Sequence, residues 1–390
     1  MVHGILDDRL FTRVGSKALI REINEALVLD VVRRSGTTSR AEITSVTGLS
    51  PATVTGISSQ LVRDGLLIES DVLRGTGGRP ARLLELGRDA VVAAGVRLSP
   101  DALEVALVDL RGEVVSTRTT RLAATDPESA ADGVVAIVSA VAAEHPTSVL
   151  RGVSIALSGI VDRSRGIVRH SGALDWQDVP FARMVGDRSG GRVMIDSLVN
   201  SFTSGLVLLD ADLAERDVIV VSVGVSLGAS MLVHGRIHRG FGGSAGGFAH
   251  SALGDRVGGR PCHCGGAGCL ETWSSVWGMR RESERRGDGS DLAVDAAEGV
   301  LAEGGRQLGI ALANAGKMFG PERIVLVLSP DVRISAFQES VERALADEYA
   351  YGDGAAPGLV TVAADSDVFA RGAGYDMITE LFSADRAETR

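Results

Sequence analysis

The sequence predicts a mixed α/β protein in which a small, mainly helical module precedes a larger body made of two similar α/β halves. Three observations support this architecture. Apolar residues recur at helical spacing through much of residues 16–64, strands and helices alternate over residues 89–390, and this alternation restarts near residue 217. A chain of 390 residues is long enough for two or three domains.

Composition and charge set the first limits on function. The chain is 45% hydrophobic, which supports a sizeable core, and it has neither an apolar run of membrane-spanning length nor an apolar leader over Met1–Arg13. We therefore expect a cytoplasmic protein with no membrane partner. The net charge is −10, but residues 1–88 carry 12 basic and 10 acidic residues, whereas the remainder carries 28 and 40. Because contact with phosphates depends on local charge, the acidic total does not exclude DNA.

Three helices are predicted in the N-terminal module. Apolar spacing predicts the first over residues 16–35. Ser39 is the expected N-cap of a second, short helix, and Glu42 completes its capping box. Ser50 caps a third helix over residues 51–64, which opens with a proline. Two short helices joined by a tight, glycine-containing turn are typical of a helix-turn-helix.

A pair of strands follows these helices. Residues 66–69 and 82–86 are predicted to pair, and the segment Arg74–Pro80 between them is a glycine-rich tip that carries arginines. The combination predicts a winged helix-turn-helix DNA-binding domain over residues 1–88, and the alternative is a small helical interaction or dimerisation domain. The expected base contacts are Ser50, Ala52, Thr53 and Thr55, and the expected backbone or minor-groove contacts are Arg40, Arg79 and Arg82.

The body is predicted from an alternation of strands and helices. The predicted strands cover residues 91–98, 103–110, 113–119, 152–157, 192–196, 217–223, 229–233, 324–329 and 359–363. Helices are predicted over residues 127–143 and 293–318, with one more after each of the last two strands. Each half is a strand meander followed by strand–helix units, which predicts a duplicated α/β domain with a cleft between two lobes.

The three cysteines of the chain, Cys262, Cys264 and Cys269, lie within eight residues. This spacing supplies three thiolates to one point, and a structural zinc ion takes four ligands in a tetrahedron. We expect His250 to be the fourth ligand, because His263 stands between two ligating cysteines and adjacent residues of an extended loop point apart. The alternative is a disulfide plus a spare thiol, which the odd count and the absence of a signal peptide disfavour.

The segment Gly258–Glu271, which reads GGRPCHCGGAGCLE, resembles the zinc signature of the ROK family of repressors, open reading frames and sugar kinases. His250 falls where that family's other zinc ligand lies. The resemblance covers nearly the whole chain, because many ROK repressors begin with a winged helix-turn-helix of this kind. For residues 89–390 it implies the two-lobed, actin-like and ribonuclease H-like fold of the sugar kinases, with a structural Zn²⁺ in a loop at residues 250–271.

Two loops that hold nucleotide phosphates in ROK kinases are altered in this chain. The first is an Asp-x-Gly-Gly-Thr loop in kinases, whereas residues 95–102 have no glycine pair and include Pro100, which lacks an amide donor. The second is Gly-Thr-Gly-x-Gly-Gly-Gly in kinases, whereas residues 224–230 keep two of the five glycines and have Val225 in place of threonine. These departures predict a lost nucleotide site, so no catalytic residue and no kinase activity are expected.

The sugar-binding side keeps more of the family pattern. The resemblance aligns Asp196 with the catalytic base and matches His250 and Glu271 to sugar-contacting positions, which makes these three the expected ligand-binding residues. The alternative for Asp196 is a cap on the following helix, and for Glu271 it is support of the zinc site. The positions that depart from the family pattern are Ala173 and Ile195, where the family usually has asparagine, and Gly247, where it usually has glutamate. Trp176 and Trp273 are expected to pack in the core rather than stack on a sugar.

These observations predict a ROK-type DNA-binding transcriptional regulator, most simply a repressor of carbohydrate genes. The expected partners are a palindromic double-stranded DNA operator, further copies of the chain in a homodimer or homotetramer, and a sugar or phosphosugar effector in a degenerate kinase cleft. Two alternatives stay open. One is an active ROK sugar kinase that carries a DNA-binding domain, and the other is a ligand-blind regulator controlled by a protein partner.

Overall fold

A computed structural model describes residues 17–73, 81–87, 91–209, 213, 216–253, 259–289, 291–292, 297–350, 355–364 and 367–382. The chain divides into two compact units, one made of Met1–Ala90 with Thr379–Arg390 and the other of Val91–Ile378. The whole of the predicted tip Arg74–Pro80, Arg79 included, lies outside the described residues. Among the helices that are described, none combines the length and apolar character needed to span a membrane.

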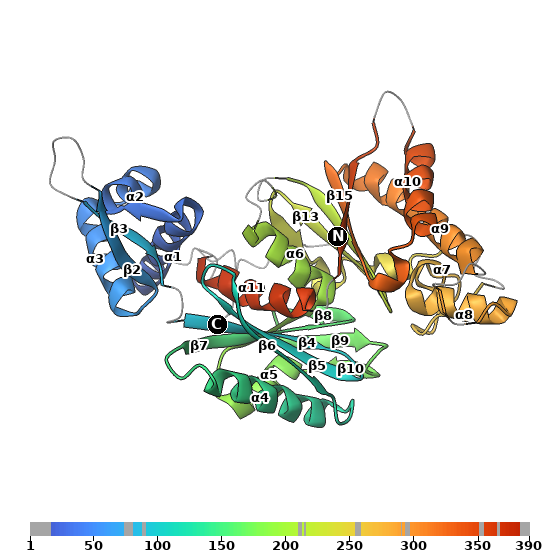
Figure 1. Ribbon diagram of the computed structural model, residues 1–390, viewed down its shortest axis with the longest axis horizontal. Coiled ribbons are helices and arrows are strands. Elements are labelled where there is room, and N and C mark those ends of the chain that lie inside the picture. Colours follow the sequence, from blue (N-terminus) through green and yellow to red (C-terminus); the bar gives the residue numbers. More distant parts are fainter. Residues whose placement is uncertain are drawn as a thin grey trace, which may run out of the picture. The chain divides into compact units, whose positions relative to one another are not determined.

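The first unit consists of helices followed by a strand pair (Figure 1). Its elements are α1 (Lys17–Ser35), β1 (Thr37–Ser39), α2 (Arg40–Thr47), α3 (Pro51–Arg63), β2 (Leu67–Leu73) and β3 (Ala81–Leu86). The strands form one antiparallel sheet in the order β1-β3-β2. The three predicted helices and the predicted strand pair are confirmed. Strand β1 was not predicted, because three residues are too short to show an alternation of apolar and polar side chains.

Side-chain caps fix where the second and third helices begin. The Oγ atom of Ser39 accepts a hydrogen bond from the backbone N–H of Glu42, and Oγ of Ser50 accepts one from the N–H of Thr53. Both predicted N-caps are therefore confirmed. The carboxylate of Glu42 accepts a hydrogen bond from the Thr38 hydroxyl at 2.9 Å, so a second side-chain hydrogen bond stabilises the start of α2.

The second unit has two lobes, and its first lobe is built around a five-stranded sheet. The elements of this lobe are β4 (Val91–Leu98), β5 (Ala102–Asp109), β6 (Val114–Arg121), α4 (Pro127–Ala143), β7 (Val149–Leu157), β8 (Ile160–Asp162), β9 (Ile167–Ser171), β10 (Trp176–Val179), α5 (Phe181–Ser189), β11 (Val193–Ser197) and α6 (Leu198–Leu209). The main sheet has the order β11-β7-β4-β5-β6, with β4, β5 and β6 antiparallel and β7 and β11 parallel to β4. Strands β8, β9 and β10 form a small separate sheet.

The second lobe repeats this plan. Its elements are β12 (Val218–Val223), β13 (Leu227–Val233), β14 (Arg236–His238), the 3-10 turns η2 (Phe241–Gly243) and η3 (Gly247–His250), α7 (Glu271–Ser274), α8 (Val276–Arg286), α9 (Glu298–Phe319), β15 (Arg323–Leu328), η5 (Pro330–Val332), α10 (Ser335–Tyr349), β16 (Gly358–Ala363) and α11 (Val368–Phe382). The sheet order is β14-β13-β12-β15-β16, again an antiparallel meander followed by parallel strands. The predicted duplication is confirmed.

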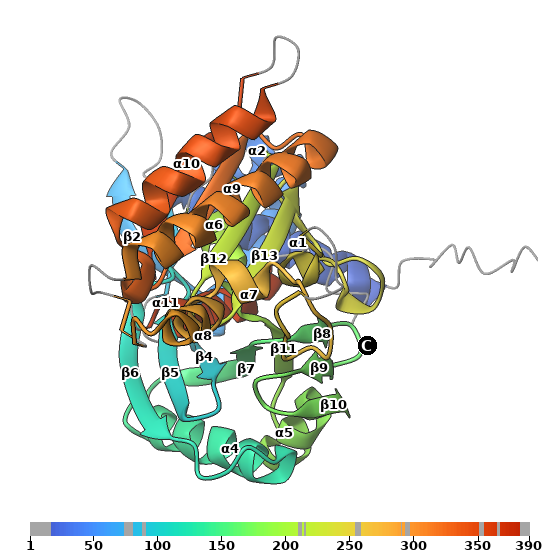
Figure 2. The ribbon, with the colours of Figure 1, turned by 90° about the vertical axis from the view of Figure 1, so that its right-hand side faces the viewer.

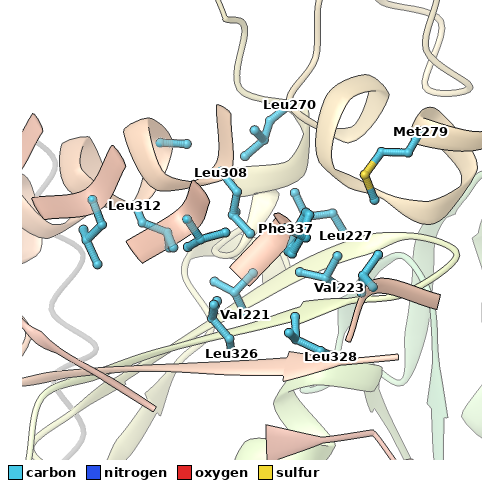
Figure 3. Packing of buried hydrophobic residues seen from close by; sticks show 14 of the residues in the cluster. Val221, Val223, Leu227, Leu270, Met279, Leu308, Leu312, Leu326, Leu328 and Phe337 are labelled. Atoms are coloured by element: carbon cyan, nitrogen blue, oxygen red, sulfur yellow. The ribbon is translucent and has the colours of Figure 1, made fainter. Parts of the chain in front are cut away.

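Helices cover the outer face of each sheet. In the second lobe α9 and α10 lie against the sheet (Figure 2), and Leu308 and Phe337 pack on Val221 and Leu326 (Figure 3). In the first lobe α4 packs on β4, β5 and β7 in a comparable apolar cluster. Burial of these apolar side chains supplies the main free energy that holds each lobe together.

Helices α6 and α11 form the layer between the two sheets (Figure 1). The rings of Phe202 on α6 and Phe369 on α11 lie 6.1 Å apart. Helix α11 also approaches β4 very closely, because a Cβ atom at Gly95 would come within 1.9 Å of the carbonyl oxygen of Ala370. Only glycine permits this approach, so the position fixes the helix against the first lobe.

The small sheet, α5 and α8 were not predicted. The strands β8 to β10 are only three to five residues long and carry mixed polar and apolar side chains, so they show no clear alternation. The structure places Trp176 of β10 in the core of the first lobe. Its indole Nε1–H donates to the carbonyl of Thr125 at 2.7 Å, and its ring lies 4.7 Å from that of Phe181. The core location predicted for Trp176 is confirmed.

Candidate functional site

Four residues form a compact group that could hold a metal ion. They are His250, Cys262, Cys264 and Cys269, whose ligand atoms all lie within 4.8 Å of one another. The Sγ atoms of Cys264 and Cys269 are 3.8 Å apart, and Sγ of Cys262 is 3.7 Å from Nδ1 of His250. A tetrahedron with metal–sulfur bonds of about 2.3 Å has edges of about 3.8 Å. The spacing of the donor atoms therefore fits one tetrahedral ion.

Short backbone contacts bring these side chains together. Isolated β-bridges join Ala252 to Cys269 and Pro261 to Ala267, so the loop folds back on itself. Gly265, between the second and third cysteines, has a φ of 84°, which a residue with a side chain adopts only with strain. A 3.0 Å hydrogen bond from the N–H of Gly265 to the carbonyl of Cys262 closes this turn. The loop is therefore shaped by its glycines as much as by its ligands.

The chemistry of the group favours a cation over a disulfide. The three cysteines, all of which are described, form no disulfide, and 3.8 Å between two sulfurs is far longer than an S–S bond of about 2.05 Å. Burial raises the pKa of the Cys262 thiol to about 12, so a thiolate at this position needs a nearby positive charge. His263 is not part of the group and instead lies with its ring 4.9 Å from that of Trp277.

A cavity of about 120 Å³ lies beside this group, between the lobes of the second unit. Its lining includes two of the three predicted ligand-binding residues, His250 and Glu271. Two of the positions that depart from the kinase pattern, Ala173 and Gly247, also line it, so side chains are missing where the pattern has polar groups. The third departure, Ile195, is fully buried in the apolar core of the first lobe.

Glu271 lies on the boundary between the metal group and the cavity. It begins α7, two residues after Cys269, and is 1% exposed. One carboxylate oxygen accepts a 2.9 Å hydrogen bond from the N–H of Leu227. The other oxygen has no hydrogen-bond partner among the residues that the structure describes. Burial raises the pKa of Glu271 to about 7, and an unpaired buried oxygen at a cavity wall is a strong acceptor for a ligand hydroxyl.

Asp196 is the third predicted ligand-binding residue, and it is not among the described residues that line the cavity. It is 0% exposed at the end of β11. Oδ2 accepts hydrogen bonds from Nε–H of Arg239 at 2.8 Å and from Arg163 at 3.4 Å, and Oδ1 accepts bonds from the amide of Asn200 and the backbone N–H of Ser197, both at 2.8 Å. The carboxylate is therefore enclosed by donors from its own protein.

Electrostatics explain how a carboxylate can be buried there. Desolvation alone would raise the pKa of Asp196, but the charges of Arg239 and Arg163 and the hydrogen bond from Asn200 outweigh it and lower the pKa. Arg163 also pairs with Asp376 of α11, which is itself buried. Ligand contact at Asp196 stays a prediction. The capping bond at the start of α6 is made by the Ser197 hydroxyl, which accepts from the N–H of Asn200 at 3.3 Å, whereas Asp196 accepts from the adjacent N–H of Ser197.

Both candidate nucleotide loops are closed by their own hydrogen bonds. At the turn between β4 and β5 the N–H of Ser99 donates to the carbonyl of Ala102 at 3.0 Å, which makes a tight hairpin. At the turn between β12 and β13 the carbonyls of Gly224 and Val225 accept hydrogen bonds from the first two amides of α8. A phosphate-binding loop presents several backbone N–H groups to the ligand, and at these two turns the N–H groups of Ser99 and Gly224 already donate to the carbonyls of Ala102 and Ser226.

The predicted DNA-contacting residues that the structure describes lie on α2, on β3 and at the start of α3. Ser50, Ala52 and Thr55 are exposed at the start of α3, and Thr53 is half-buried beside them. The Thr55 hydroxyl donates a hydrogen bond to the carbonyl of Pro51 at 2.8 Å.

Four charged residues of these sites were not predicted from the sequence, namely Glu69, Arg163, Arg239 and Asp376.

Arg40 and Arg82, which are predicted to contact the DNA backbone, both pair with Glu69 of β2. Arg40 at the start of α2 is 26% exposed, whereas Arg82 of β3 is 67% exposed. Arg79 lies outside the described residues.

Comparison with known proteins places this architecture in a family. The family model described as ROK family matches residues 93–354. The chain is 26% identical over 342 residues to the xylose repressor of Caldicellulosiruptor bescii, covering 80% of this chain and 84% of that protein. It is also similar to the crystal structure of a ROK family transcriptional regulator, a homolog of E. coli Mlc, with 22% identity, a TM-score of 0.79 and coverage of 94% of this chain and 98% of that one.

A second solved structure is an enzyme. The ROK family glucokinase of Streptomyces griseus, determined with glucose and AMPPNP, has 21% identity and a TM-score of 0.62, and covers 73% of this chain and 98% of its own. These structural likenesses establish the fold, which is the mixed α/β, actin-like fold of the sugar kinases. With a family model that matches well over half of its length, the chain belongs to the ROK family.

Proposed function

We propose that this protein is a DNA-binding transcriptional repressor, in which residues 1–88 form a winged helix-turn-helix and residues 89–390 form a ligand-sensing body without kinase activity. The observation that carries the proposal is the order α2–turn–α3 followed by the hairpin β2–β3, with small polar side chains exposed at the start of α3. Recognition helices present their first residues to base edges in the major groove. The similarity to a xylose repressor over 80% of the chain supports the same role.

Loss of kinase activity is supported by the state of the groups that a kinase would use. The carboxylate of Asp196 is enclosed by Arg239 and Arg163, so its Oδ atoms are already taken up by donors of the protein. A general base must reach the proton that it removes within about 3 Å. The two turns that would hold phosphates are also closed by backbone hydrogen bonds.

The body is proposed to bind a sugar or phosphosugar effector in the cavity beside Glu271. The supporting feature is the unpaired, buried oxygen of Glu271, which a ligand hydroxyl would satisfy. His250 and His263 also line this cavity. A ligand can shift a regulator only if it binds two conformations unequally. The second candidate is a body that binds no small ligand and is controlled by a protein partner. The small volume of the cavity, about 120 Å³, supports it.

The metal ion proposed for His250 and the three cysteines is a structural Zn²⁺. Three thiolates and one imidazole at tetrahedral spacing are a ligand set that zinc favours, and the set leaves no open position for a reacting water. Zinc would fix the loop that ends at Glu271 and so hold one wall of the cavity. The proposed operator is palindromic and is bound by a homodimer or homotetramer, since one small recognition helix per chain gives modest affinity.

Selection of bound duplexes from a random library by the full-length chain tests the repressor proposal. We expect enrichment of a palindrome, and loss of binding to it in a variant with Thr55→Asp, because a carboxylate at the start of α3 repels phosphates. The variant should keep the melting temperature of the wild-type protein, since Thr55 is exposed. If the chain releases ADP from ATP in the presence of a hexose, the alternative of an active kinase that carries a DNA-binding domain replaces the proposal. If no duplex sequence is enriched, the proposed DNA binding fails.

A further inference from the structure

Glu69 joins the two arginines that are predicted to contact the DNA backbone. It lies on β2, 26% exposed, between α2 and β3. One of its oxygens is 2.8 Å from Arg40, and its other oxygen pairs with Arg82. Hydrogen bonds from Arg82 and then from Arg40 lower the pKa of Glu69, so the carboxylate is charged at neutral pH. A single carboxylate therefore bridges two guanidinium groups.

The same contacts fix the direction of Arg40 with respect to the proposed recognition helix. Nε–H of Arg40 donates to the hydroxyl of Ser58 on α3 at 3.0 Å, while its NH2 group reaches Glu69. Ser58 is fully buried and its hydroxyl is bonded to the carbonyl of Val54 at 2.6 Å. Arg40 is thus tied to α3 on one side and to β2 on the other, and it keeps only part of its donor set for a phosphate.

The two ion pairs of Glu69 reduce the positive charge that the first unit can offer to DNA. Residues 1–88 have a net charge of only +2, and the whole chain has −10. Binding to DNA of any sequence depends on how many phosphates the basic side chains neutralise. With Glu69 between them, Arg40 and Arg82 present one net positive charge to a phosphate instead of two. A phosphate must also compete with the Glu69 carboxylate for the same N–H groups.

We propose that Glu69 is a specificity-determining residue, which holds Arg40 and Arg82 in place and limits their affinity for the phosphates of non-operator DNA. This inference rests on the proposed DNA-binding function of the first unit. Specificity is the ratio of operator binding to binding at all other sites, so a residue that weakens the second raises the ratio. At an operator, base contacts by α3 supply additional binding free energy, which lets the two guanidinium groups leave Glu69 and bind the phosphates.

The test is a salt titration with a labelled random-sequence duplex of about 30 base pairs and the full-length chain. Glu69→Gln keeps the size of the side chain and removes its charge. We expect tighter binding to this duplex, and a plot of log K against log salt that is steeper by about one unit, since each added phosphate contact contributes about 0.9. The matched control is Glu144→Gln, which removes the same charge from an ion pair with Arg118 in the body and should leave the slope unchanged.

A double variant separates the proposed role from a general effect of charge. In a background with Arg82→Gln, the change caused by Glu69→Gln should shrink to about half or less, because one of the two arginines that Glu69 restrains is gone. Equal effects in both backgrounds, or an unchanged slope for Glu69→Gln alone, would overturn the inference while leaving DNA binding intact. If the wild-type chain shows no salt-dependent binding to any duplex, it is the proposed function that fails.

Discussion

The Nε–H group of Arg239, which follows β14 in the second lobe, donates a 2.8 Å hydrogen bond to Oδ2 of Asp196 at the end of β11 in the first lobe. Arg163 completes the group and also pairs with Asp376 of α11. The guanidinium groups of Arg163 and Arg239 and the carboxylates of Asp196 and Asp376 thus form one network, in which the positive and negative charges balance. Where the family resemblance aligns a catalytic base, this chain has an ion pair that connects its two lobes.

The first prediction concerns the stability of this ion pair. Asp196→Asn should lower the free energy of unfolding by about 3 kcal/mol, because it removes the buried carboxylate that Arg239 and Arg163 share. Urea denaturation followed by circular dichroism measures this value. Asp132→Asn is the control, since Asp132 pairs with Arg188 at the surface and exposed ion pairs add little to stability. Equal losses for the two variants would contradict the prediction.

The same pair predicts a pH dependence with a definite sign. The pKa of Asp196 is lowered in the folded protein, so its contribution to stability is fully present above about pH 5 and is lost as the pH falls through the folded-state pKa. The difference in unfolding free energy between the wild-type protein and Asp196→Asn should therefore be constant from neutral pH to about pH 5 and shrink below about pH 4. A difference that grows with acidification has the wrong sign for this mechanism.

Metal analysis tests the zinc proposal. Freshly purified protein should contain one equivalent of zinc per chain, and Cys269→Ser should remove it and lower the melting temperature, because the metal links loop closure to folding. His263→Gln is the matched control. This histidine lies between two of the proposed ligands in sequence but packs against Trp277, so the variant should keep its zinc. Loss of metal in the control with retention in Cys269→Ser would reassign the ligands.

Features set by neighbouring residues could be predicted, and features set by distant ones could not. The N-caps at Ser39 and Ser50 depend on amides three residues away, and the sequence displays that spacing directly. The arginine partners of Asp196 are 33 and 43 residues distant, and Arg163 and Asp376 are 213 residues apart. No spacing rule connects such residues before the fold is known. The metal group was predictable because three of its four ligands are close in sequence.

Ser50 has two proposed roles that substitution can separate. Its hydroxyl caps α3 by accepting from the N–H of Thr53 at 3.1 Å, and it is also a predicted base contact. Ser50→Ala should lower the free energy of unfolding by about 1 kcal/mol, whereas Ser50→Asp should preserve the cap. DNA binding should nevertheless be lost in Ser50→Asp, because the new carboxylate faces the phosphates. If Ser50→Asp binds the selected operator normally, this residue is a cap and does not contact DNA.

The last prediction concerns the cavity and the glutamate that the kinase pattern has at Gly247. A Cβ atom at Gly247 would meet no atom within 4 Å, and the residue lines the cavity. Gly247→Glu should therefore fold normally and place a second carboxylate near Glu271, where sugar hydroxyls can donate to both. Gly246→Ala is the steric control, because Gly246 has a φ of 90° and its Cβ atom would lie 2.3 Å from the carbonyl oxygen of Ala229.

Thermal shift with a panel of hexoses and hexose phosphates is the measurement for Gly247→Glu. The melting temperature should rise with ligand concentration, as expected for a ligand that binds only the folded state, and by more than in the wild-type protein. Gly246→Ala should melt at a lower temperature with every ligand and without any, since strained backbone costs about 1–3 kcal/mol. A Gly247→Glu variant that folds normally but responds to no sugar would mean that the cavity has lost more than one hydroxyl-binding group. The body would then fit better with control by a protein partner, because the unpaired oxygen of Glu271 alone does not select a sugar.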